Sequence, residues 1–142
     1  LAMASKYPNM TREQLVEIVA GKQEGLDAEQ IAVYAKPEFS SLQMNSLRYS
    51  FDAGMTQEQI AFQANPAFDS VQMDIIRASF QAGLSMEQVQ TFAHPGVSAN
   101  QMLEAHLAIR NGRTWEPAEE SPELQPETEV GVWEAGEPDL EP

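Results

Sequence analysis

Residues 37–65 read PEFSSLQMNSLRYSFDAGMTQEQIAFQAN, and residues 66–94, which follow directly, read PAFDSVQMDIIRASFQAGLSMEQVQTFAH. The two segments match position for position, with a period of 29 residues. Self-similarity at a fixed period indicates an array of stacked repeats. The period extends to both sides and is clearest in three columns: Pro8, Pro37, Pro66 and Pro95; Gly25, Gly54, Gly83 and Gly112; and Gln14, Gln43, Gln72 and Gln101.

Each period carries the signals of two helices. Ser40, with Gln43 three residues later, is a capping box that opens a longer helix, here called A. Gly54 can adopt the left-handed conformation that ends this helix. Thr56 and Gln59 form a second capping box, which opens a shorter helix B that must end before the next proline. We therefore predict four A helices, at 12–23, 41–52, 70–81 and 99–110, and three B helices, at 28–35, 57–64 and 86–93.

The sequence thus predicts an all-α fold, a short solenoid of about 3.5 helical hairpins. The predicted repeat domain is residues 8–113, with repeats at 8–36, 37–65 and 66–94 and a half repeat at 95–113. Apolar residues at helical spacing predict the core. In the second repeat these residues are Met44, Leu47 and Phe51 on helix A, and Ile60 and Ala64 on helix B.

Charge separates the end of the chain from the rest. Of the 142 residues, 22 are acidic and 8 are basic, giving a net charge of −14. Residues 114–142 hold ten acidic residues, no basic ones and five of the nine prolines. Such a composition cannot bury enough apolar area to offset its ordering entropy, so we predict an acidic disordered tail over 114–142. Residues 1–7 are also predicted to be disordered, and Leu1 and Ala2 are interpreted as additions before Met3.

Several classes of chemistry are disfavoured. The chain has no cysteine, which excludes disulfides, thiolate metal sites and a cysteine nucleophile. His94 and His106 lie twelve residues apart and form no ligand motif. The single glycines punctuate helix ends and form no phosphate loop. We therefore expect no enzyme activity, metal or cofactor. With no leader or membrane span visible, we expect a cytoplasmic protein that does not engage a membrane.

One column holds Arg48, Arg77 and His106. It has two interpretations. It is either a cationic ladder that grips an acidic peptide, a phosphate or the protein's own tail, or a set of surface residues that pair locally. The second interpretation is favoured, with Arg48 pairing with Asp52 four residues on and His106 lying on the surface.

The last A helix remains apolar although no helix B follows it. Met102, Leu103 and Leu107 would be left open there unless Trp115, a second copy or a partner covers them. Self-association through this helix is therefore one expectation. Trp133, in the tail stretch EVGVWEAG, is either an anchor for a partner pocket or an incidental aromatic.

Two resemblances bear on function. The first is to the first helix junction of phage-repressor-type helix-turn-helix domains, which the segments AGMTQEQIA and AGLSMEQVQ resemble. Here the turn that follows is too long and the next helix has little positive charge, so nucleic-acid binding is not expected.

The second is to short helical repeats of bacterial proteins often carried by mobile elements. The repeated pattern that resembles them is P-x-F-[SD]-S-x-Q-M-x-x-[IL]-R, followed by A-G-[LM]-[ST]-x-E-Q. That resemblance covers residues 8–112. The group has no assigned activity, so the resemblance implies architecture and no catalytic residues.

The leading functional hypothesis is a non-enzymatic module that binds a protein partner of unknown identity. The alternative is an acidic decoy that occupies the nucleic-acid site of another protein, suggested by the net charge of −14. A DNA-binding helix-turn-helix array is the third hypothesis.

Overall fold

The computed structural model describes residues 6–117, so the predictions made for residues 1–5 and 118–142 lie outside the described part of the chain. Residues 6–117 form seven α-helices and no strand. The A helices are α2 (Arg12–Gln23), α4 (Ser41–Asp52), α6 (Ser70–Gln81) and α8 (Ala99–Arg110), and the B helices are α3 (Ala28–Tyr34), α5 (Gln57–Gln63) and α7 (Met86–Gln90).

All four A helices have the predicted bounds, whereas α3 and α5 each end one residue early and α7 ends three residues early. The short α7 has a local cause. The Thr91 hydroxyl donates to the Gln88 carbonyl at 2.6 Å, and the Thr91 backbone amide donates to the same carbonyl. A threonine side chain that takes a backbone carbonyl competes with the helical pattern, so the last turn tightens there.

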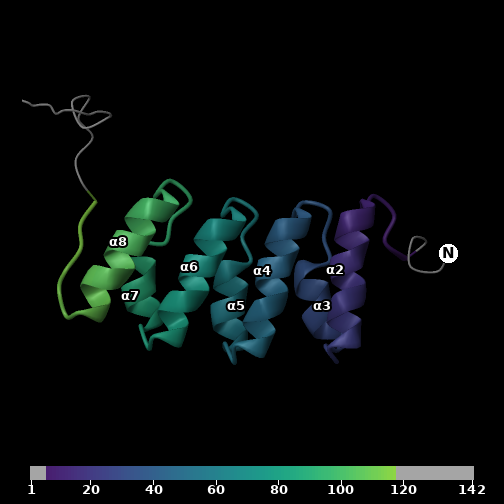
Figure 1. The fold of residues 1–142 in the computed structure, drawn as a ribbon, viewed down its shortest axis with the longest axis horizontal. Coiled ribbons are helices and arrows are strands. Elements are labelled where there is room, and N and C mark those ends of the chain that lie inside the picture. Colours follow the sequence, from purple (N-terminus) through teal and green to yellow (C-terminus); the bar gives the residue numbers. More distant parts are fainter. Residues whose placement is uncertain (1–5, 118–142) are drawn as a thin grey trace, which may run out of the picture.

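The helices form two layers. The A helices α2, α4, α6 and α8 lie side by side in the order of the sequence, and each packs against the next (Figure 1). The B helices α3, α5 and α7 lie behind them. Helix α3 packs against α2 and α4, α5 packs against α4 and α6, and α7 packs against α6. None of these helices is long and apolar enough to cross a membrane.

The helix boundaries follow from the predicted local signals. Every one of the seven described helices begins with a capping box. In α4, for example, the Gln43 amide donates to the Ser40 hydroxyl at 3.1 Å, and the Ser40 amide donates to the Gln43 side chain at 2.7 Å. Gly54 has φ of +77°, in the left-handed region that closes an A helix. The other glycines of that column share this conformation: Gly25, Gly83 and Gly112.

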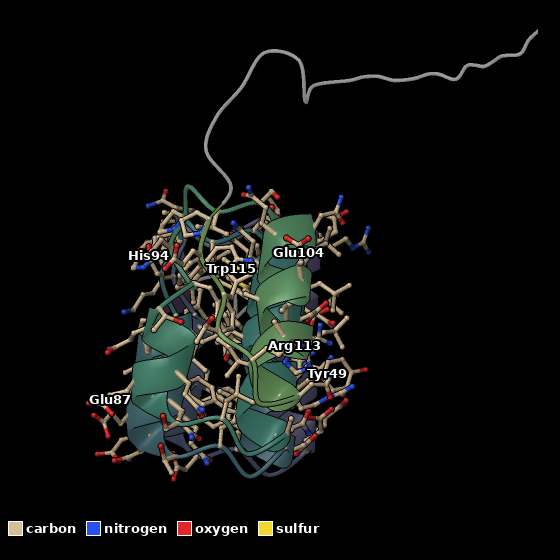
Figure 2. All side chains as sticks on the ribbon, turned by 90° about the vertical axis from the view of Figure 1, so that its left-hand side faces the viewer. Tyr49, Glu87, His94, Glu104, Arg113 and Trp115 are labelled. Atoms are coloured by element: carbon tan, nitrogen blue, oxygen red, sulfur yellow. The ribbon has the colours of Figure 1, made fainter. Side chains whose placement is uncertain are left out.

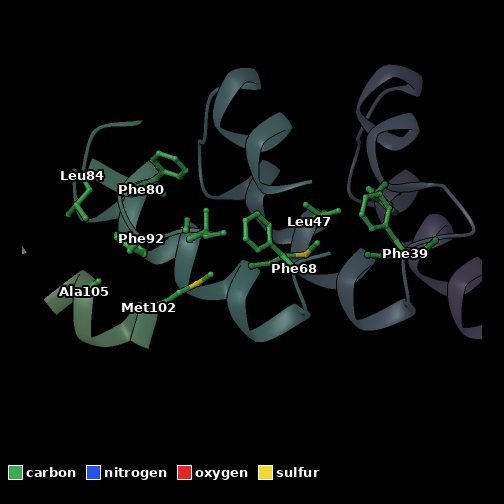
Figure 3. Packing of buried hydrophobic residues seen from close by; sticks show 14 of the residues in the cluster. Phe39, Leu47, Phe68, Phe80, Leu84, Phe92, Met102 and Ala105 are labelled. Carbon is green, nitrogen blue, oxygen red and sulfur yellow. The ribbon is translucent and has the colours of Figure 1, made fainter. Parts of the chain in front are cut away.

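The core lies between the two layers (Figure 3). Met44, Leu47 and Ile60 are buried as predicted, whereas Phe51 and Ala64 are half-buried. The proline-containing loop before each A helix also sends a side chain inward, and Phe39 and Phe68 from these loops are buried. Burying one aromatic side chain of this kind stabilises the fold by about 1.5–3 kcal/mol.

One pair of core positions changes chemistry between repeats. In the first repeat, the hydroxyl of the fully buried Tyr34 donates to the Glu17 carbonyl at 2.8 Å. A Cβ on Gly21 would stand 2.0 Å from that hydroxyl, so only glycine fits beside Tyr34. The equivalent residues of the next repeat are Ser50 and Gln63, and the Ser50 hydroxyl donates to the Gln63 side-chain oxygen at 2.7 Å. The two positions therefore vary together.

Candidate functional site

Arg48 does not form the predicted pair with Asp52. Its side chain reaches back from α4 to α2, where its guanidinium contacts Glu17 at 3.1 Å and also pairs with Glu24. Burial acts to lower the pKa of Arg48, but the hydrogen bond and charge of Glu17, with the charge of Glu24, outweigh burial and raise this pKa. The predicted pair of Arg48 and Asp52 is wrong because the side chains at this repeated position point toward the preceding A helix rather than along their own helix.

Arg77 uses the same direction one repeat later. Its guanidinium donates to the Ser46 carbonyl at 2.7 Å and to the Ser46 hydroxyl at 3.0 Å, both on the preceding helix α4. It also pairs with Asp74 on its own helix at 2.8 Å. Arg77 is half-buried, so it ties α6 to α4 and also presents an edge to solvent.

His106, the third member of the column, is buried and not on the surface as predicted. Its Nδ1 lies 2.8 Å from the hydroxyl of Ser79 on the preceding helix α6. Burial, and then the positive charge of Arg110, lower the pKa of His106. The column therefore joins neighbouring A helices, because each of its three side chains bonds to a residue of the preceding A helix.

The contact between Ser79 and His106 brings a hydroxyl beside a base, which the sequence did not lead us to expect. Ser79 has no exposed surface, and its hydroxyl also donates to the Ile75 carbonyl at 2.9 Å. A nucleophile needs access for the substrate and an orienting group on its base. This pair has neither among the residues described, so we assign it to packing. Within residues 6–117, no cluster of histidine, cysteine and carboxylate side chains could hold a metal ion.

The glutamine column has a second role that sequence reasoning missed. The side-chain oxygen of Gln43 completes the capping box of its own helix. The side-chain nitrogen of Gln43 donates to the Pro66 carbonyl at 3.0 Å and also to the Phe68 carbonyl. Gln14 and Gln72 make the same pair of bonds to the loops at 37–39 and 95–97. We call this contact the glutamine clamp. It fastens α2, α4 and α6 to the loop that begins the next repeat.

The carboxyl end of the array is covered in part. Trp115 packs against the core and meets Phe92 edge to face, with ring centroids 6.4 Å apart. Figure 2 shows Trp115 between the two layers at this end of the molecule. Trp115, one of the three covers considered for this end, thus lies against the core and contacts Phe92, which follows α7. Leu103 and Leu107 remain 46% and 41% exposed, and only Met102 is fully buried.

The exposed apolar residues are confined to one layer. Every large apolar side chain that is exposed among the described residues belongs to an A helix, and we call this surface the A face. Tyr49 points away from the array on this side, whereas Glu87 points away on the side of the B helices (Figure 2). The A face comprises Val16, Val19, Leu42, Tyr49, Val71, Leu103 and Leu107.

Two hollows lie elsewhere on the described surface. One, of about 610 Å³, is at the amino end of the array and is lined by Lys6, Lys22 and Lys36 over apolar residues of α3. The other, of about 510 Å³, lies between α3 and α5 and includes Phe51 and Met55. Neither was predicted, because the repeat pattern does not reveal which grooves between helices stay open.

Trp133 lies outside the described residues. No family model, curated protein or solved structure matches this chain. The resemblance to helical repeats of mobile elements therefore stays a prediction.

Proposed function

We propose that residues 8–113 form a short α-solenoid that serves as a non-enzymatic protein-binding module. The solenoid part of the proposal is supported by the regular order of the A helices and by the glutamine clamp, which recurs at each of the three junctions between repeats. Stacked repeats that contact only their neighbours offer extended surfaces for a partner.

The A face is the observation that carries the binding proposal. Its apolar residues occupy repeated positions: Leu42 and Val71 are equivalent, as are Tyr49 and Leu107. Single exposed apolar residues are ordinary, but apolar side chains gathered on one side of a molecule mark contact surfaces. The B helices expose polar and small residues instead. A partner that binds here would therefore bring an apolar surface of its own against α4, α6 and α8.

A capture experiment tests the assignment. The full chain, immobilised at one end, is incubated with lysate of the source organism, and bound proteins are identified by mass spectrometry. A double variant, Leu42→Glu with Val71→Glu, places two charges on the A face. The matched control, Ala61→Glu with Gln90→Glu, places two charges on exposed positions of the B helices.

We expect one or a few proteins to bind the parent chain and the control, and to lose at least tenfold in recovery on the A-face variant. Circular dichroism spectra of all three proteins must agree, so that unfolding is not mistaken for lost binding. A partner retained equally by both variants would place the binding surface elsewhere. The absence of any specific partner would count against the module.

The acidic decoy is the second candidate, favoured by the net charge of −14 and by its concentration in the tail. Salt separates the two candidates. Binding that depends on many charges collapses between low and moderate salt, whereas apolar contacts persist. Raising the salt from about 50 to about 300 mM shortens the screening length roughly twofold. Repeating the capture at both concentrations therefore identifies which class of contact holds the partner.

A further inference from the structure

The pocket at the amino end of the array has an unusual charge. Lys6, Lys22 and Lys36 line it, and these are the only lysines of the chain. None of them pairs with an acidic residue within residues 6–117, and no acidic residue of that range lines the pocket. The floor is apolar and includes Leu26 and Ile31. This combination suits a ligand that is acidic and also carries a large apolar group.

The second pocket shows what the first one lacks. Its α5 side is built by Met55 and Ile60, which are the equivalents, 29 residues on, of Leu26 and Ile31. Its opposite side is helix α3 with its N-cap Asp27, which contribute Asp27, Glu29, Gln30 and Val33, and Lys36 lines this pocket as well as the first. The pocket at the amino end is thus the same groove without a preceding B helix. By analogy with the second pocket, the side that is absent at the amino end would supply two acidic residues and an apolar residue, the counterparts of Asp27, Glu29 and Val33.

The tail of the chain carries that set of groups. Glu127, Glu129 and Trp133 repeat the spacing of Asp27, Glu29 and Val33, with an acid, a second acid two residues later and an apolar residue four residues after that. We propose that segment 127–134 of the tail binds, in its own molecule, to the lysine-lined pocket at the amino end of the array. The segment lies outside the described residues, and its chemistry, taken from the sequence, complements the pocket.

The tail is long enough for this contact. The described chain ends beyond α8, whereas the pocket is lined by residues of and beside α2 and α3, which lie at the opposite end of the row of helices (Figure 1). Three helix-to-helix steps of about 8–10 Å separate α8 from α2, or about 30 Å. An extended chain covers about 3.3–3.6 Å per residue, so the stretch of about ten residues from Pro117 to Glu127 spans about 35 Å. Attachment to the same molecule also gives the segment an effective concentration of the order of millimolar.

Cross-linking tests the proposal on the full chain. A carbodiimide joins a lysine amine directly to a carboxylate that it touches, and every lysine of this chain lines the pocket. After digestion, mass spectrometry of the linked peptides should find Lys22 and Lys36 joined mainly to Glu127, Glu129 or Glu134. Links spread evenly over the ten tail acids, or no links to the tail, would overturn the proposal.

Isotopes distinguish the two molecules that could supply the tail. Equal amounts of ¹⁵N-labelled and unlabelled chain are mixed before cross-linking. Contact within one molecule gives linked peptides that are wholly labelled or wholly unlabelled. Linked peptides of mixed label at about half of the total would show that a second copy supplies the tail, and would overturn binding within the molecule.

Two substitutions probe the contact itself. Trp133→Ala removes the apolar group without changing the charge, and we expect it to lower the yield of links by about tenfold. Ala32→Glu places an acid at an exposed position of the pocket and should also lower the yield severalfold. Its control, Ala61→Glu, is the same change one repeat later and should leave the yield of links to Lys22 intact, because Lys22 lines only the first of the two pockets. Unchanged yields in Trp133→Ala, or equal losses in Ala32→Glu and Ala61→Glu, would overturn the assignment.

Discussion

Replacing Gly21 by alanine should destabilise the protein, although alanine is the better helix former. Gly21 lies inside α2, where alanine in place of glycine ordinarily stabilises by about 1 kcal/mol. Here the new Cβ would stand 2.0 Å from the Tyr34 hydroxyl, 3.2 Å from its ring carbon Cζ and 3.3 Å from a methyl group of Leu26. The hydroxyl must move, because two such atoms cannot approach so closely.

The magnitude follows from what Tyr34 loses. Moving its hydroxyl breaks the bond to the Glu17 carbonyl, which leaves a buried polar group unsatisfied at a cost of about 1–3 kcal/mol. Crowding of the core adds about 1–3 kcal/mol. After the helical gain of about 1 kcal/mol is subtracted, Gly21→Ala should lower the free energy of unfolding by about 1–5 kcal/mol.

Tyr34→Phe removes the atom responsible for the clash. Alone, it should cost about 0.5–1.5 kcal/mol, the worth of one hydrogen bond. Combined with Gly21→Ala, only the contacts beyond 3 Å remain, so the double variant should be about as stable as Tyr34→Phe alone. Urea unfolding of the four proteins, followed by circular dichroism, gives the coupling energy, which we expect to be favourable by as much as Gly21→Ala alone loses, about 1–5 kcal/mol. Additive effects of the two substitutions would refute the steric argument.

Three further predictions concern the clamp, the turns and pH, and urea unfolding checks each. Gln72→Ala should lower the free energy of unfolding by about 1–3 kcal/mol more than Gln101→Ala, because Gln101 forms a capping box but no clamp. Equal losses would show that the clamp does not stabilise the fold. Gly54→Val should cost about 1–3 kcal/mol through its positive φ, whereas Gly96→Val, where φ is not positive, should cost far less; similar costs would contradict the turn assignment. Because the pKa of His106 is lowered from 6.5, the unfolded chain binds the proton more readily, so stability should fall as pH drops through about 6.5, and this fall should shrink in His106→Gln.

Local signals explain why the helix bounds were predictable. A capping box and a glycine turn depend on residues within one turn of the chain, and the structure contains both at the repeated positions. The burial of Met44 and Leu47 was equally predictable, because helical spacing alone places them on one face of the helix. The early end of α7 depended on a competing bond from Thr91, which the period does not reveal.

The side-chain partners were less predictable because they depend on how neighbouring A helices are rotated against each other. That rotation decides that Arg48 reaches Glu17 rather than Asp52, and that His106 turns inward. The clamp was hidden for another reason: a capping box uses only the oxygen of the glutamine side chain, and glutamate would serve as well. A glutamine rather than a glutamate at each such position of the A helices is the signal that could have indicated a role for the nitrogen.

The glutamine clamp also bears on how such a chain can change its length. Each junction is made by a side chain of one period and two carbonyls of the next, so no junction needs residues from further away. Gln101 has the same capping geometry as its predecessors, and in the described chain no loop of a further period follows it. A duplication of any whole multiple of 29 residues would therefore create a new junction that already has its donor and acceptors. A duplication of any other length would misplace them, so only duplications in steps of one period add a repeat with its clamp complete.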